Sequence, residues 1–128
     1  MIIQGLIETN KGPIDIRDLK VGDCVLNQMH RAYPITTIEK VEVTGGVTFK
    51  KNKALVVAKN TVVRTLYGQT ILTGKKKIMI TMVQPNMREI RDVAIPIAGN
   101  FQAYNIKVDD GAEVFANNYC IEMENGYA

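Results

Sequence analysis

The chain of 128 residues is poor in several residue types that mark specialised protein classes. It has no tryptophan, one histidine and two cysteines, and only 6% of its residues are aromatic. Two cysteines cannot form a disulfide framework, and neither cysteine has a spacing typical of a metal site. We therefore expect no metal and no cofactor. The core must be built mainly from Val, Ile, Leu and Met side chains.

Long apolar runs and targeting signals are also missing. No stretch approaches the roughly 18 apolar residues of a membrane span, and Met1–Gly5 lacks the basic and apolar regions of a signal peptide. We therefore expect a cytoplasmic protein with no membrane partner. The 46% apolar and 23% charged residues are typical of a globular chain and predict a single domain over residues 1–128. The net charge of +3 falls short of a dedicated nucleic-acid binder, so we expect no nucleic acid as the main partner.

Turn signals and β-branched runs recur along the chain and predict an all-β fold of short antiparallel strands and hairpins. No segment keeps a helical period for three turns. Besides an opening strand within residues 1–10, we expect strands at 34–47, 54–66 (with a break at 59–60), 70–73, 78–83, 88–97, 101–108, 114–116 and 119–123. We expect turns at 10–13, 45–46, 50–53, 74–77, 109–111 and 117–118.

The segment Pro13–Leu26 is the most specific part of the sequence. Its apolar residues predict an anchor on the β core, and its Val-Gly-Asp step predicts a tight turn that leads into a strand at Cys24. Gly22 suits a backbone position with positive φ, and the Asp23 side chain can bond its own turn. The residues alone therefore predict a short docked segment that feeds a strand.

After a threonine and a glycine, this segment has the residue pattern P-x-x-I-x-D-L-x-x-G-D-x-V. The pattern resembles the opening of the Hint fold that hedgehog autoprocessing domains and inteins share. Two further segments fit the resemblance: Leu55–Thr61, where the family has a Thr-x-x-His motif, and Tyr104–Asn118, which is similar to its closing hairpin. The resemblance covers nearly the whole chain. It implies a horseshoe of two pseudo-repeated β subdomains.

The resemblance also implies a chemistry. In the family, a first-residue cysteine or serine attacks the carbonyl before it and converts a peptide bond to a thioester or ester. The Thr-x-x-His pair orients this amide and gives a proton to the departing nitrogen. In inteins, a final asparagine then cyclises beside a histidine.

The family's catalytic positions carry other residues here. The nucleophile position falls on Met1, whose thioether has no ionisable proton, and the Thr-x-x-His positions fall on Ala58 and Thr61. A threonine hydroxyl cannot replace imidazole as a proton donor near neutral pH. The closing His-Asn falls on Glu122 and Met123, neither of which can form a succinimide. We therefore expect no enzymatic activity by the family's mechanism.

The other candidate residues have ordinary explanations. His30 fits an exposed loop, and Cys24 fits a buried small apolar residue at the start of a strand. Cys120 lies on a strand that the resemblance brings near the family's active centre, and it stays a candidate nucleophile. The Asp109–Gly111 stretch fits a hairpin turn better than a calcium loop.

Two lysine runs are expected at hairpin tips. They are Lys50, Lys51 and Lys53, and Lys75, Lys76 and Lys77. Solvated turns explain them, and a phosphate-contacting or partner-contacting patch would need both tips on one face.

The leading hypothesis is a catalytically inactive Hint-fold module with a structural or protein-interaction role, self-association included. Degenerate members of the family occur in phage and mobile-element proteins, and the resemblance therefore suggests such an origin for this chain. The alternatives are residual protein self-processing, and weak nucleic-acid binding through the lysine tips.

Overall fold

The computed structural model describes residues 1–27, 29–65, 68–73, 76–82, 88–108 and 113–124, of which 76–82 are described by their backbone alone. The strands are β1 (Ile2–Gln4), β2 (Leu6–Thr9), β3 (Gly12–Asp15), β4 (Cys24–Leu26), β5 (Ala32–Phe49), β6 (Asn52–Ala58), β7 (Val62–Arg64), β8 (Gln69–Ile71), β9 (Lys76–Met82), β10 (Arg88–Val108), β11 (Glu113–Ala116) and β12 (Tyr119–Glu122). The described residues contain no helix, so the all-β prediction is confirmed. None of these residues therefore belongs to a helix that is long and apolar enough to cross a membrane.

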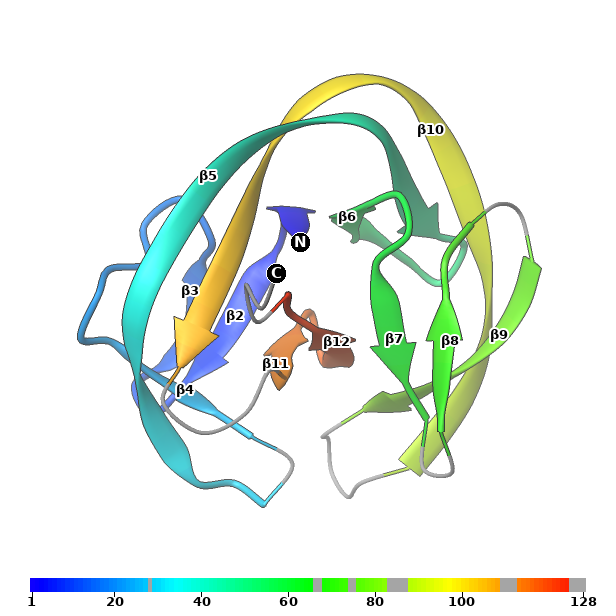
Figure 1. Cartoon of the computed structure of the whole chain (residues 1–128). Coiled ribbons are helices and arrows are strands. Elements are labelled where there is room, and N and C mark those ends of the chain that lie inside the picture. Colours follow the sequence, from blue (N-terminus) through cyan, green and yellow to red (C-terminus); the bar gives the residue numbers. More distant parts are fainter. Residues whose placement is uncertain (28, 66–67, 74–75, 83–87, 109–112, 125–128) are drawn as a thin grey trace.

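The strands form one antiparallel sheet in the order β11-β2-β4-β5-β6-β1-β10-β9-β12-β7-β8, with β3 paired to β2. Figure 1 shows β5 and β10 running together as an arch over the shorter strands, which gives the molecule a horseshoe outline. The short strand β1 lies between β6 and β10, where Ile2 pairs with both Val57 and Tyr104. The horseshoe that the resemblance implied is therefore present.

The two long strands differ from the prediction. We expected the strand that begins near Pro34 to end at Gly45–Gly46, and we divided residues 88–108 into two strands; both expectations are wrong. β5 and β10 pair from Phe49 opposite Ala94 to Ile35 opposite Val108, with a register shift between Ile97 and Asn100. Gly45 (φ 85°) and Gly99 (φ 133°) have positive φ, so these glycines bend strands that continue instead of ending them.

Other strand boundaries also shifted. The opening strand is divided at Gly5, where a Cβ atom would lie 3.0 Å from Leu55 Cδ1 and 3.1 Å from Asn117 Oδ1. Turns were expected at 10–13 and 74–77, but Gly12 and Pro13 already belong to β3 and Lys76 and Lys77 to β9; residues 74 and 75 lie outside the described residues. The turn expected at 109–111 lies outside the described residues.

The predicted turn residues behave as expected where the structure describes them. Gly22 has φ 97°, and Asn117 and Asn118 have φ 47° and 70° between β11 and β12. Asparagine tolerates this left-handed region better than most residues. The composition predicted a core of mainly Val, Ile, Leu and Met. Among the described residues, the largest fully buried side chains are Ile, Leu and Val together with the rings of Phe49 and Phe115, and Met123 is 3% exposed.

Candidate functional site

The centre of the horseshoe brings Met1 against the segment that follows β6. The Met1 α-amino nitrogen lies 3.2 Å from Thr61 Oγ1, and the Thr61 hydroxyl lies 3.3 Å from the Met1 carbonyl oxygen. The backbone N–H of Ala58 donates to the same carbonyl at 2.9 Å. Thr61 is 5% exposed and Ala58 is 3% exposed. The structure thus brings together three residues that the sequence placed at the family's nucleophile and Thr-x-x-His positions.

Burial determines the charge of this centre. It lowers the pKa of the Met1 α-amino group from 8.0 to about 6, and the nearby Glu124 carboxylate opposes part of this shift. The amine is therefore mostly neutral at pH 7. A neutral amine beside a hydroxyl forms hydrogen bonds but supplies no strong acid.

The two residues at the closing positions, Glu122 and Met123, make contacts with other parts of the fold. The Glu122 carboxylate accepts a hydrogen bond from the Gln69 side chain of β8, and Met123 is buried at 3% exposure. The next residue, Glu124, is held by Asn105, whose side-chain amide donates to the Glu124 carbonyl at 2.7 Å and accepts from its N–H at 2.9 Å. Asn105 was not identified from the sequence as a structural residue. The pattern that could have revealed it is a polar residue on the same face of the predicted strand as the apolar Ala103.

Cys120 does not have the environment of an accessible nucleophile. It is 0% exposed, and its thiol lies 3.3 Å from Glu113 Oε2. Arg64 Nε lies 3.4 Å from the other oxygen of the same carboxylate. The thiol is therefore buried and already donates a hydrogen bond to a carboxylate. His30, the other half of a conceivable Cys–His pair, lies in the exposed turn between β4 and β5.

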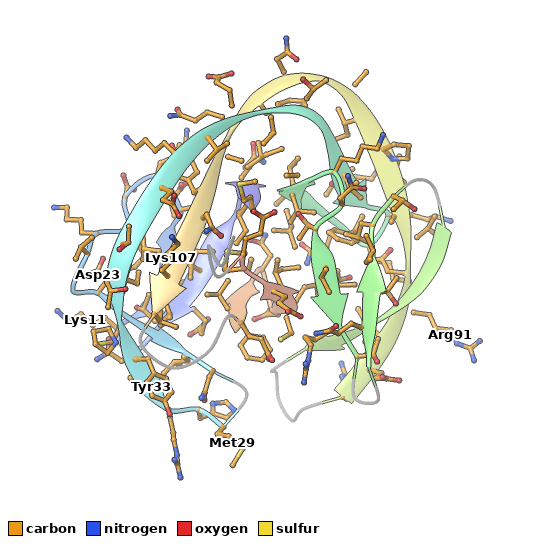
Figure 2. All side chains as sticks on the ribbon, in the orientation of Figure 1. Lys11, Asp23, Met29, Tyr33, Arg91 and Lys107 are labelled. Atoms are coloured by element: carbon orange, nitrogen blue, oxygen red, sulfur yellow. The ribbon has the colours of Figure 1, made fainter. Side chains whose placement is uncertain are left out.

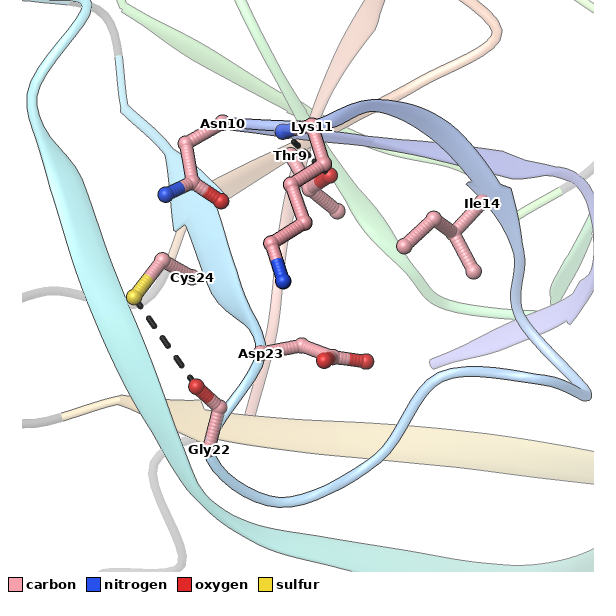
Figure 3. Close-up of a pocket in the computed structure, with 7 residues that line it drawn as sticks. All are labelled: Thr9, Asn10, Lys11, Ile14, Gly22, Asp23 and Cys24. Carbon is pink, nitrogen blue, oxygen red and sulfur yellow. Dashed lines mark hydrogen bonds between the residues drawn. The ribbon is translucent and has the colours of Figure 1, made fainter.

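The second cysteine differs slightly from its prediction. Cys24 is half-buried instead of buried, and its Sγ lies 3.9 Å from the Gly22 carbonyl oxygen. It lines a small pocket of about 230 Å³ that the Lys11 and Asp23 side chains also border, as Figure 3 shows. The described residues contain no group of three or more His, Cys, Asp or Glu side chains that could hold a metal ion.

A buried carboxylate that sequence reasoning also missed lies under the turn between β5 and β6. Asp92 is 4% exposed and accepts hydrogen bonds from the Tyr119 hydroxyl, from the Lys51 N–H at 3.0 Å and from the Val93 N–H at 2.7 Å. Burial and the Asp92 carboxylate raise the pKa of Tyr119 well above its usual range. The Tyr119 ring also packs edge-on against Phe49, with 5.2 Å between ring centroids. Asp92 therefore fixes the backbone of this turn from below.

The lysines of the first run are exposed, but only Lys50 and Lys51 form the turn, since Lys53 already lies in β6. In the second run, Lys75 lies outside the described residues. Lys76 and Lys77 begin β9 and pair with Ala94 and Val93 of β10.

Comparisons with known proteins agree with this architecture. No family model and no curated protein matches the sequence. Solved inteins share the fold: the gp41-1 intein has a TM-score of 0.74 at 15% identity, with 94% of each chain covered. The MchDnaB-1 intein (N145AA) has a TM-score of 0.74 at 14% identity, with 96% of this chain and 98% of that chain covered. A DnaB intein from Synechocystis has a TM-score of 0.73 at 11% identity, with the same coverage. The chain therefore has the Hint fold of inteins, as the resemblance in its opening segment predicted.

Proposed function

We propose that this chain is a catalytically inactive Hint-fold module that serves as a structural or protein-interaction domain. The observation that carries the proposal is the pair of contacts between Met1 and Thr61. In this position, the family's mechanism needs a nucleophilic side chain on the first residue and an imidazole beside its nitrogen. A thioether and a hydroxyl stand there instead.

Each missing group removes a separate step. The Met1 thioether has no proton to lose and cannot take part in an acyl shift. The Thr61 hydroxyl forms hydrogen bonds with the nitrogen and the carbonyl of Met1, but it is too weak an acid to protonate a departing amine near neutral pH. Glu122 and Met123 lack the side-chain amide that succinimide formation needs.

Residual self-processing through Cys120 is the alternative, and its surroundings argue against it. The thiol is fully buried, and it donates to Glu113, which also pairs with Arg64. Attack on a peptide bond would require both loss of this hydrogen bond and exposure of β12.

Intact-mass measurement tests the absence of processing. The chain is expressed with flanking segments at both ends and aged with and without thiol, beside a Cys120→Ala control. We expect one uncleaved mass for both proteins. Cleavage that Cys120→Ala abolishes would refute the proposal and identify the alternative nucleophile, and cleavage that persists in this variant would refute it through another group.

A second experiment examines whether the first residue alone is limiting. Met1→Cys, with the upstream segment attached, is treated with hydroxylamine to trap a thioester. We expect no trapped product, because Ala58 and Thr61 still occupy the assisting positions. A hydroxylamine adduct of the upstream segment would show that the remaining residues support acyl transfer.

The interaction role is supported by an exposed apolar side chain. β8 is the last strand in the sheet order of the described residues, and Ile71 on this strand is 53% exposed. Such a side chain can pack against a second copy of the chain. We expect concentration-dependent dimerisation in sedimentation velocity that Ile71→Lys weakens; a monomer at all concentrations would remove self-association from the proposal.

A further inference from the structure

The fold brings the two lysine runs to opposite sides of the same pair of residues in β10. Lys77 pairs with Val93 and Lys76 with Ala94 on one side. On the other side, the Lys50 N–H donates to the Val93 carbonyl at 3.0 Å. Neighbouring strands lie about 4.8 Å apart, so the backbones of the two runs are about 10 Å apart. Segments about 25 residues apart in sequence thus meet at one corner of the sheet, where the turn between β5 and β6 meets β9 and β10 in Figure 1.

Arg91 adds a further cation to this corner. It lies two residues before Val93 on the same strand, about 7 Å along the backbone and on the same face by strand alternation. Its side chain is exposed and points away from β10 toward solvent, as Figure 2 shows. We call Lys50, Lys51 and Arg91, together with Lys77 at its register position opposite Val93, the basic corner; the register position of Lys76, opposite the buried Ala94, belongs to the other face of the sheet.

The backbone of the basic corner is fixed, and its described side chains are not neutralised by the ion pairs of the fold. Asp92 points inward, where it holds the Lys51 N–H from below the turn. The other acid nearby on β10 is the half-buried Glu89. The ion pairs among the described residues are Arg17–Asp15, Arg64–Glu113 and Lys107–Glu39, and none of them includes a member of the basic corner.

We propose that the basic corner binds the phosphate backbone of a nucleic-acid duplex without reading its bases. Closely spaced cations on a rigid backbone suit the dense row of phosphates on a duplex. None of the exposed large apolar side chains that the structure describes belongs to β9, β10 or the turn between β5 and β6; they are Leu6, Val21, Met29, Val41 and Ile71. The corner therefore has no described apolar anchor for a membrane and no described aromatic ring on which a single-stranded base could stack. This inference does not depend on whether the centre around Met1 is inactive.

Fluorescence anisotropy with a labelled 20-base-pair DNA duplex tests the proposal between 50 and 200 mM salt. We expect a dissociation constant of roughly 10⁻⁴ to 10⁻⁶ M, independent of sequence. About three phosphate contacts predict a slope of log K against log salt near −3.

Three variants localise the binding. Lys50→Gln, Lys51→Gln and Arg91→Gln together are expected to weaken binding at least about tenfold and to reduce the slope to near −1. The matched control replaces the exposed Lys11, Lys20 and Lys40 by Gln, which removes the same charge away from the corner, and should retain most of the affinity. Lys77→Gln is expected to weaken binding as well.

Four results would overturn the proposal. They are no binding of the wild-type chain at 50 mM salt, equal losses in the corner triple and its control, unchanged affinity after substitution of Lys77, and binding to vesicles containing 30% phosphatidylserine without binding to the duplex. Equal losses would mean that overall charge, and not the corner, attracts the duplex. Far-ultraviolet circular dichroism of each variant verifies that its fold is retained.

Discussion

The buried α-amino group of Met1 predicts a pH-dependent stability. In the unfolded chain this amine has an ordinary pKa of 8.0, whereas burial lowers it to about 6 in the fold. Between these values the unfolded state binds more protons than the folded state, so the free energy of unfolding rises with pH. Two pKa units correspond to about 2.7 kcal/mol over the whole titration, of which we expect about 2 kcal/mol as the gain between pH 6 and pH 8. This gain is a large part of the stability of a small domain.

Urea unfolding at pH 6, 7 and 8 measures this dependence. Histidine side chains in general titrate near this window, so the comparison is made in His30→Asn, which suits the φ of 57° at that exposed position. The Glu124→Gln variant provides a second test of the same prediction. Because the Glu124 carboxylate raises the pKa of the amine, its removal should lower this pKa further and enlarge the pH dependence. A flat or falling stability between pH 6 and pH 8 in His30→Asn would refute the reasoning.

Three further predictions concern the groups that hold the fold together. Tyr119→Phe should lower the free energy of unfolding by about 1.5–3 kcal/mol, because it removes a hydrogen bond to the buried Asp92 carboxylate; an unchanged midpoint in urea would contradict this. Asn105→Ala should cost about 1–3 kcal/mol and speed hydrogen exchange at the Glu124 amide, which would stay protected if Asn105 were dispensable. Gly22→Ala should cost about 1 kcal/mol through backbone strain at φ 97° alone, since an added Cβ atom would meet no other atom within 4 Å; a stabilised protein in thermal melts would disprove it.

Local chemistry explains which parts of the fold were predictable. Gly22 and the Asn117–Asn118 pair mark turns because their conformations are set by their own residue types. The same logic failed at Gly45 and Gly99, where glycine bends a strand that continues. Whether a glycine ends a strand or bends it depends on the partner strand, and the pairing of β5 with β10 joins residues that are far apart in sequence.

The candidate site likewise has features that the sequence predicted and features that it could not. Resemblance to the Hint opening gave Met1, Ala58 and Thr61 as one constellation, and the structure brings them together. No local pattern could reveal that Asp92 lies beneath Lys51, because this contact depends on the register between two strands. The lysine runs were predicted at separate tips, and only the pairing of β9 and β5 with β10 places them at one corner.

The position of β1 has a consequence for how the molecule is made. Its partners are Val57 and Tyr104, so this strand, once it leaves the ribosome, must wait for residues synthesised much later. At about 5–20 residues per second, roughly 100 residues take about 5–20 s. During that time β1 can pair with β6 once Val57 has emerged, but its other side, which pairs with β10, stays open. Completion of the arch is therefore a late event in biosynthesis, and a nascent chain stalled before Tyr104 should be a substrate for chaperones and proteases.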